Sequence, residues 1–372
     1  MSEEHQIKRL YDTLQIVDPK SREFTDEERL KQIGRPLLSW YEERARVLPW
    51  REDAAPYRVW ISEIMLQQTR VEAVKPYFER FMGALPKVED LAAVPEDRLL
   101  KLWEGLGYYN RARNLKKAAQ TIVESYSGEL PPDYEELMTL PGIGSYTAGA
   151  IASIAYGIPV PAVDGNVLRV LSRVLASDRD ILKQSTKRWL EEILAAAIPR
   201  NRASQFNQGL IEIGAIVCIP NGQPKCPECP LASLCLARIR GLISQIPVKT
   251  PKKQRKTEQK TVALIQAGDQ LAIKKRGATG LLAALYEFPN VEGHLNANQL
   301  PAAFHLEESE ITGIEALGPA KHIFTHVEWH MIGYRIVLAA SIPEEYIAAD
   351  RESLAQDYPL PNAFSAYKKQ LD

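Results

Sequence analysis

The chain has 372 residues, 45% of them hydrophobic and 25% charged, with a formal net charge of −1. The length predicts about two domains with sizeable cores, and the composition is typical of soluble globular proteins. The charge excludes a protein that attracts polyanions by an overall basic surface, so any contact with nucleic acid must use local basic groups or backbone amides.

Two features indicate a cytoplasmic protein without a membrane-spanning segment. The first residues contain no apolar region of the kind found in secretory signals. The most apolar stretch, residues 148–163, is interrupted by Gly157, Pro159 and Pro161 and is too short to cross a bilayer. In the cytoplasm the four cysteines are expected to stay reduced or to bind a metal.

The chain shows helical periodicity from about residue 35 to residue 217. Between Tyr57 and Met82, large apolar side chains recur at intervals of three and four residues, as on one face of a long helix. Shorter helical stretches follow at 88–94, 96–103, 111–126 and 134–139, separated by Pro, Gly and Asn. We therefore expect an all-helical first domain, residues 1–240, with short connections.

A Gly-x-Gly turn at Gly142 and Gly144 opens the helix predicted within residues 140–157. Most such turns have only a structural role, but their backbone N–H groups, together with the N-terminus of the following helix, can bind a phosphate. Asp164 then stands at the start of a helix predicted over Val167–Leu175. Its simplest role is an N-cap, but the two features together suggest a phosphate grip beside a carboxylate.

Glu63 and Asp164 could form a pair of carboxyl groups in opposite protonation states. Glu63 lies mid-helix with mostly apolar neighbours, so partial burial would raise its pKa and keep it protonated near neutral pH. A helix N-terminus would instead lower the pKa of Asp164 and keep it ionised. An acid and a charge-stabilising carboxylate are the groups that cleavage of a glycosidic bond requires.

All four cysteines fall within residues 218–235, among several prolines. Thiols at this density in a cytoplasmic protein indicate a metal site rather than disulfides. The spacing by itself leaves zinc and a [4Fe–4S] cluster almost equally favoured, because only one Cys-x2-Cys pair is present. The candidate ligands are Cys218, Cys226, Cys229 and Cys235.

The character of the sequence changes after a connector at residues 241–259, which is rich in proline and charge. Val262–Ile265 and Leu271–Ile273 flank Gly268-Asp269 and predict a β-hairpin. Further strands are expected within residues 322–340, and short helices at 300–304 and 350–356. Residues 260–372 therefore predict a smaller α+β domain.

Several motifs give the chain a resemblance to a known family. The helix–hairpin–helix segment 140–157, Val163-Asp164-Gly165-Asn166 and the four-cysteine loop resemble the helix–hairpin–helix DNA glycosylase superfamily. Residues 48–51 (Leu-Pro-Trp-Arg), 62–69 (Ser-Glu-Ile-Met-Leu-Gln-Gln-Thr) and 103–109 (Trp-Glu-Gly-Leu-Gly-Tyr-Tyr) resemble the MutY-type adenine DNA glycosylases within it. Residues 279–289 resemble the Nudix-like recognition domain of that family, without a catalytic Nudix pattern.

The resemblance implies a hydrolase that removes adenine mispaired with 8-oxoguanine or guanine from double-stranded DNA, after flipping the adenine out of the helix. Glu63 would protonate adenine N7, and Asp164 would stabilise the sugar cation. Tyr146 and Asn166 would support these two carboxyl groups. The resemblance also implies that the cysteines bind a [4Fe–4S] cluster, and we expect the protein to act as a monomer.

The remaining candidate residues would contact DNA. Leu48 and Arg51 would line the adenine pocket, and Gln68 and Tyr108 resemble residues that fill and wedge the duplex. The backbone at Gly142 and Gly144 would hold phosphates. The loop that reads the 8-oxoguanine strand would contain Phe324, Thr325 and His326.

Tyr146 distinguishes the hydrolytic glycosylase from a close alternative. Relatives of the endonuclease III type that also cleave the strand carry a lysine there, which forms a Schiff base with the sugar. A phenol cannot form an imine, so we expect a monofunctional glycosylase rather than a bifunctional glycosylase/lyase. A third possibility is a catalytically dead lesion-binding protein, which the intact Glu63 and Asp164 argue against. The seven-residue first cysteine gap and Thr325, where serine is common, depart from the family pattern.

Overall fold

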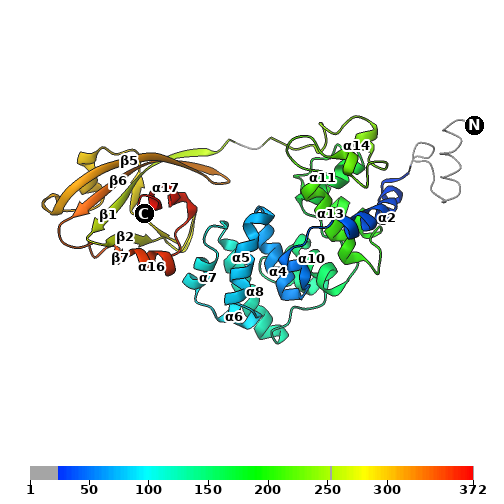
Figure 1. Cartoon of the computed structure of the whole chain (residues 1–372), viewed down its shortest axis with the longest axis horizontal. Coiled ribbons are helices and arrows are strands. Elements are labelled where there is room, and N and C mark those ends of the chain that lie inside the picture. The colour runs from blue at the N-terminus through cyan, green and yellow to red at the C-terminus, as the bar shows by residue number, and fades with distance from the viewer. Residues whose placement is uncertain (1–23, 252–253, 372) are drawn as a thin grey trace, which may run out of the picture. The chain divides into compact units, whose positions relative to one another are not determined.

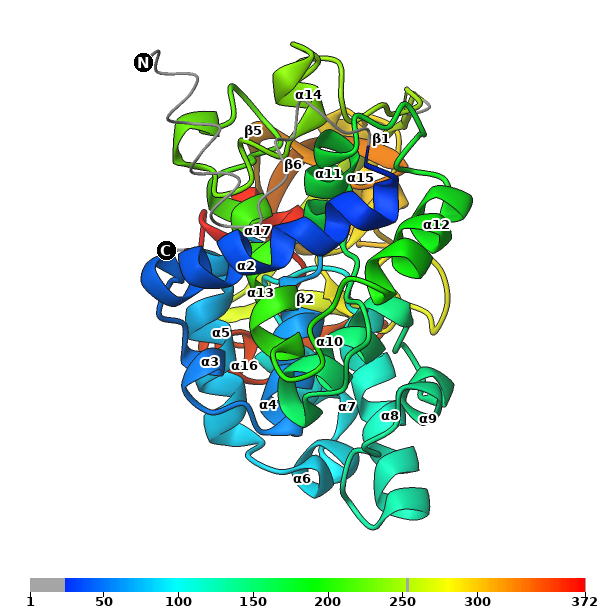
Figure 2. The same cartoon turned by 90° about the vertical axis from the view of Figure 1, so that its right-hand side faces the viewer.

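The computed structural model describes residues 24–251 and 254–371 (Figures 1 and 2). Its contacts group the chain into two compact units. Unit 1 extends to Met82 and resumes over Thr121–Pro251, and unit 2 comprises Gly83–Gln120 and the chain from Lys252 onward. The boundaries inferred from the sequence, with a connector at 241–259, stay a prediction.

The described part of residues 35–217 is helical with short connections, as predicted. The helices before the cysteine loop are α2 (Asp26–Arg44), α3 (Pro49–Glu52), α4 (Pro56–Leu66), α5 (Val71–Ala84), α6 (Val88–Ala93), α7 (Glu96–Leu102), α8 (Asn110–Tyr126), α9 (Tyr134–Thr139), α10 (Ser145–Tyr156), α11 (Gly165–Val174), α12 (Gln184–Ala195) and α13 (Ala203–Ile216). The short helix α14 (Leu236–Ile239) follows that loop.

The expectation of one long helix over Tyr57–Met82 is wrong, because the chain breaks between α4 and α5. Gln68 in this break has a φ of 58°, a left-handed conformation that cannot continue a right-handed helix. The backbone carbonyl of Arg70 then accepts hydrogen bonds from the N–H groups of Ala73 and Val74 and starts α5. Apolar periodicity continues through the break, so it did not reveal the break.

The core of unit 1 forms where α13 packs against α2, α10 and α11. Each helix contributes an apolar face, and Leu37, Leu171 and Leu210 are fully buried. Burial of each such side chain stabilises the fold by about 1.5–3 kcal/mol. Helix α10 also packs against α4, which brings residues distant in sequence to one place.

Two glycines permit the close contacts that position the start of α11 and the segment before it. A Cβ atom on Gly149 of α10 would lie 2.1 Å from the carbonyl oxygen of Pro161. A Cβ atom on Gly214 of α13 would lie 2.5 Å from the Cβ of Asn166. Both distances are far below van der Waals contact, so larger residues would displace the chain around Asp164.

Unit 2 contains a seven-stranded sheet with the order β3-β2-β1-β6-β5, in which β4 also pairs with β1 and β7 with β2. The strands are β1 (Lys256–Ala267), β2 (Gln270–Lys275), β3 (Tyr286–Glu287), β4 (Asn290–Glu292), β5 (Ile311–Ile323), β6 (Val327–Leu338) and β7 (Ile347–Ala349). Strands β1 and β6 run parallel along their whole length, and the other pairs are antiparallel.

The predicted hairpin is confirmed, because β1 and β2 pair antiparallel and Ala267 lies opposite Gln270. The predicted helices are also present as α15 (Leu300–Ala303) and α16 (Arg351–Gln356), and α17 (Ser365–Lys368) follows them. Apolar clusters cover both sides of β1: Val262 and Leu264 belong to one, and Ala263 and Ile265 to the other. The α+β prediction for this part of the chain is therefore correct.

In the part of the chain that the structure describes, no helix is both long and apolar enough to cross a membrane.

We predict that Gly149→Ala lowers the free energy of unfolding by about 1–3 kcal/mol, because the new methyl group must push the Pro161 backbone away. Urea denaturation measures this change. The matched control is Gly83→Ala in α5, where a Cβ atom would meet nothing within 4 Å, and it should be neutral or slightly stabilising. Equal stability of Gly149→Ala and wild type would contradict the proposed close contact.

Candidate active site

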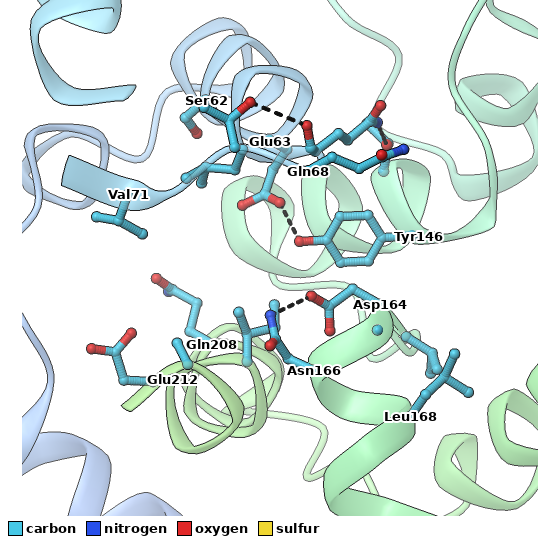
Figure 3. A pocket seen from close by; sticks show the side chains of 18 of the residues that line it. Ser62, Glu63, Gln68, Val71, Tyr146, Asp164, Asn166, Leu168, Gln208 and Glu212 are labelled. Atoms are coloured by element: carbon cyan, nitrogen blue, oxygen red, sulfur yellow. Dashed lines mark hydrogen bonds between the residues drawn. The ribbon is translucent and has the colours of Figure 1, made fainter. Parts of the chain in front are cut away.

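A cavity of about 920 Å³ opens within unit 1 between α4, α10, α11 and α13 (Figure 3). Residues from these helices and from the loops beside them line it. Of the residues singled out in the sequence, those on the wall of this cavity are Leu48, Arg51, Glu63, Gln68, Gly144, Tyr146, Asp164 and Asn166. The fold therefore brings together side chains from four separate parts of the sequence.

Glu63 lies in the middle of α4 and is only 6% exposed. The Tyr146 hydroxyl, at the start of α10, donates a hydrogen bond to its carboxyl group (Figure 3). Burial raises the pKa of Glu63 to about 7, although the Tyr146 hydrogen bond and the charge of Arg51 act in the opposite direction. A substantial fraction of Glu63 is therefore protonated at neutral pH.

Asp164 caps the N-terminus of α11 and is partly exposed to the cavity. Its Oδ1 accepts a hydrogen bond of 2.8 Å from the Val167 N–H, and its Oδ2 accepts one of 2.8 Å from Asn166 Nδ2. The expected lowering of its pKa is wrong in direction, because burial raises the pKa of Asp164 and outweighs these hydrogen bonds. The hydrogen bonds nevertheless favour the charged form.

Arg169 holds Asn166 in place beneath Asp164. Its Nη2 donates 2.8 Å and 2.7 Å hydrogen bonds to Asn166 Oδ1 and the Gly214 carbonyl, and its Nε donates a 2.8 Å bond to the Cys218 carbonyl. The side chain is only 5% exposed. A continuous set of hydrogen bonds thus connects Asp164 with the start of the cysteine loop.

Glu212, which the sequence analysis did not single out, is a second buried carboxyl group on the cavity wall. Its Oε1 accepts a 2.7 Å bond from Arg46 Nε, and its Oε2 accepts a 2.8 Å bond from Arg51 Nη2. Burial alone would raise the pKa of Glu212, but the two arginines lower it on balance, so the group is ionised. Gln208, one turn earlier on α13, also lines the cavity. Like Glu63, Glu212 lies within an apolar run of the sequence, and such a run is a signal that the carboxyl group is buried.

The Gly-x-Gly turn lies between α9 and α10, as predicted. Gly142 has a φ of 78°, which favours glycine, whereas Gly144 is extended and lines the cavity. Beside the turn, Lys187 Nζ of α12 donates a 2.8 Å hydrogen bond to Ser145 Oγ. Gly142 itself is exposed and is not on the cavity wall.

The four cysteines surround a separate cavity of about 20 Å³ in unit 1. Arg173 Nη1 donates a 3.1 Å hydrogen bond to Cys218 Sγ, and Cys235 Sγ donates to the Arg173 carbonyl at 3.3 Å. Burial raises the pKa of the Cys229 thiol to about 12. Across the described residues, no three His, Cys, Asp or Glu side chains are close enough together to hold a single metal ion. The thiols therefore share a cavity without converging on one point.

The remaining candidates belong to unit 2. Tyr108 is 47% exposed with a φ of 48°, and its hydroxyl lies 3.2 Å from Thr325 Oγ1. Phe324 packs edge-on against Trp329, with ring centres 4.9 Å apart, while His326 is exposed. Tyr108 and the loop between β5 and β6 thus form one cluster within this unit.

Comparison with known proteins adds to this geometry. Residues 61–196 match the HhH-GPD superfamily of base excision DNA repair proteins, and residues 261–370 match the NUDIX domain, which confirms the predicted fold classes. The adenine DNA glycosylase of Rattus norvegicus is 33% identical over 379 residues, covering 86% of this chain and 73% of the relative. The adenine DNA glycosylase of Buchnera aphidicola subsp. Baizongia pistaciae is 36% identical over 293 residues, covering 78% and 82%.

Among solved structures, a non-covalent endonuclease III–DNA complex superimposes with a TM-score of 0.50 at 28% sequence identity. The match covers 59% of this chain and 99% of that chain.

The raised pKa of Glu63 predicts a stability that depends on pH. The folded state holds the proton more tightly than the unfolded state, so this contribution is complete below about pH 4.5 and is lost as the pH rises through about 7. Relative to Glu63→Gln, a neutral mimic, the wild type should lose about 3 kcal/mol of unfolding free energy over this range. Urea denaturation of both proteins across the range measures the difference. Parallel pH profiles would show that Glu63 titrates normally.

Proposed function

Because the chain belongs to the adenine DNA glycosylase family, we propose that it hydrolyses the N-glycosidic bond of adenine in duplex DNA during base excision repair. We propose further that the adenine is mispaired with 8-oxoguanine or guanine. The observation that carries the proposal is that Glu63, with a raised pKa, and Asp164 line the same cavity. One residue can give a proton while the other carries negative charge.

In the proposed mechanism the chemistry begins with Glu63. An adenine anion is a poor leaving group, so a proton on N7 must accompany departure of the base. A carboxyl group with a pKa of about 7 is protonated often enough to give that proton at neutral pH. Tyr146 positions the carboxyl group through its hydrogen bond. After the bond breaks, the Glu63 carboxylate can accept a proton from the attacking water.

Asp164 would stabilise the positive charge that develops on the sugar as the base leaves. Val167 N–H and Asn166 hold both of its oxygens, so the carboxylate is already oriented before the substrate binds. Asn166 is held in turn by Arg169, which limits its movement. This preorganisation favours an oxocarbenium-like transition state.

The cavity would take the adenine after it leaves the base stack. Arg51, Gln208 and Glu212 lie on its wall, and Leu48 adds an apolar surface. The adenine amino group donates hydrogen bonds that the oxygens of Gln208 and Glu212 can accept. Guanine presents an acceptor at the same position and would meet repulsion, which gives a physical basis for selecting adenine.

DNA binding is supported by the similarity to endonuclease III, whose structure was determined in complex with DNA. We propose that the backbone at Gly142 and Gly144 holds phosphates and that Gln68 and Tyr108 enter the duplex. Both of these side chains project from left-handed backbone, which is uncommon outside glycine and is found at functional sites. Phe324, Thr325 and His326 would read the base opposite adenine. We propose a monomer that acts on nucleoid DNA in the cytoplasm.

We propose that Cys218, Cys226, Cys229 and Cys235 hold a [4Fe–4S] cluster. Four thiols around one cavity provide the donor set of such a cluster, which takes one thiolate at each iron. When bound, the cluster would act as a structural cross-link and need not change its redox state. It would fix the loop that carries Lys225 and so present positive charge to DNA.

Two other functions fit the fold less well. A bifunctional glycosylase/lyase needs an amine to form a Schiff base, and the Tyr146 phenol beside Glu63 cannot supply one. A catalytically dead lesion-binding protein would not need a carboxyl group buried at such a cost. The pairing of Glu63 with Tyr146 therefore favours the hydrolytic enzyme.

We predict that the wild type releases adenine from A·8-oxoguanine and A·G duplexes and far more slowly from A·T. Glu63→Gln should reduce release on the order of 10²–10⁴-fold because the amide cannot give a proton. Single-turnover cleavage assays measure the rates, and gel-shift titration should give nearly unchanged duplex binding for the variant.

Full activity of Glu63→Gln would remove Glu63 from the chemistry. Tight binding by the wild type without adenine release would favour the dead binding protein. A covalent DNA adduct trapped by borohydride would favour the lyase.

We predict that anaerobically purified protein contains about four iron and four sulfide ions per chain. Cys229→Ser should lose most of the iron and lower the melting temperature. The matched control, Ser233→Ala, changes an exposed residue of the same loop and should keep both. Elemental analysis showing about one zinc and no sulfide would replace the cluster with a zinc site.

A further inference from the structure

The basic side chains on the wall of the active-site cavity fall into two groups. Four of them have partners in the protein: Arg46 and Arg51 contact Glu212, Arg169 contacts Asn166, and Lys187 contacts Ser145. The other two, Arg70 and Lys249, have no hydrogen bond or ion pair from their side chains to any residue that the structure describes. Their charges are therefore available to a ligand.

Lys249 is exposed, yet the backbone on both sides of it is held in place. The Val248 carbonyl accepts a 3.1 Å hydrogen bond from the Ile181 N–H. The Thr250 N–H donates a 3.2 Å hydrogen bond to Asp180 Oδ2, and the Thr250 hydroxyl donates to the same oxygen. The loop between α11 and α12 thus fixes the direction in which Lys249 leaves the backbone.

The segment that carries Lys249 is anchored a second time at Ile246. The Ile246 carbonyl accepts a 2.8 Å hydrogen bond from Arg173 Nε. The Ile246 side chain is 6% exposed and packs with Cys235 and Ala237. Residues 246–250, here called the anchored segment, are therefore held within unit 1.

The carboxyl groups of the cavity make a cation on its wall favourable for binding a polyanion. Glu63, Asp164 and Glu212 all line the cavity, so a polyanion that approaches it meets carboxyl groups. Arg46 and Arg51 are engaged by Glu212 and offset mainly that charge. An exposed ammonium group on the same wall would attract a phosphate and offset the remaining repulsion.

We propose that the anchored segment forms one wall of the DNA-binding surface and that Lys249 binds a backbone phosphate of the strand whose nucleotide enters the cavity. The inference rests on the proposed function, since it takes duplex DNA as the ligand. A lysine is a point charge without the fork of an arginine, so the contact positions the strand and does not read its sequence. Lys249 is thus a substrate-positioning residue outside the chemical step.

The test measures duplex binding as a function of salt. Glu63→Gln serves as the parent, so that the A·8-oxoguanine duplex stays intact, and Lys249→Gln is added to it. Loss of one phosphate contact should reduce the slope of log Kd against log salt concentration by about 0.9 and weaken binding roughly threefold near physiological salt.

The matched control is Lys31→Gln, which removes the same charge from a partly exposed lysine on α2 that pairs with Glu27 and does not line the cavity. Its salt slope should equal that of the parent. Equal slopes for Lys249→Gln and the parent would overturn the inference and leave the proposed function intact. Absence of any duplex binding by the parent would overturn both.

A second variant tests whether the anchoring matters. Asp180→Ala removes both hydrogen bonds to Thr250 without changing Lys249. If the segment is held for DNA binding, this variant should also lower the salt slope, and adding Lys249→Gln to it should have little further effect. Fully additive losses in the two variants would overturn the positioning by Asp180.

Discussion

The structure of the candidate site depends on the burial of one carboxyl group. Glu63 lies among apolar side chains of α4, and its nearest polar partner is the Tyr146 hydroxyl. A buried carboxyl group is costly when charged and tolerable when protonated, so the fold itself raises its pKa to about 7. The packing of two helices thus keeps a proton on this carboxyl group near neutral pH.

Asp164 carries the same chemical group, and burial raises its pKa as well. It also lies at the cavity, but a backbone N–H and the Asn166 amide bind its oxygens. The charged form of Glu212 is favoured more strongly, because Arg46 and Arg51 pair with it and lower its pKa. Three carboxyl groups on one cavity wall therefore differ in their hydrogen-bond partners: the pKa is raised for Glu63 and Asp164 and lowered for Glu212.

Close packing fixes these groups relative to each other. Gly149 lets α10 approach the Pro161 carbonyl, and Gly214 lets α13 approach Asn166. Arg169 then joins Asn166 to the cysteine loop through the Cys218 carbonyl. A cluster bound by that loop would stabilise the position of Asp164 from a distance, so a structural role for the cysteines does not exclude an influence on the chemistry.

The sequence by itself determined the two fold classes and the grouping of four thiols in one loop, and it placed Glu63 in an apolar run that the fold buries. Local patterns carry this information, because helical periodicity, a Gly-x-Gly turn and clustered thiols each occupy a short stretch of chain. Only the tertiary structure decided that α4 ends before Gln68, that burial outweighs the helix N-terminus at Asp164, and that Glu212 and Lys249 line the same cavity. These features arise from burial and from contacts between segments that are distant in the sequence. No local sequence pattern records which segments will meet.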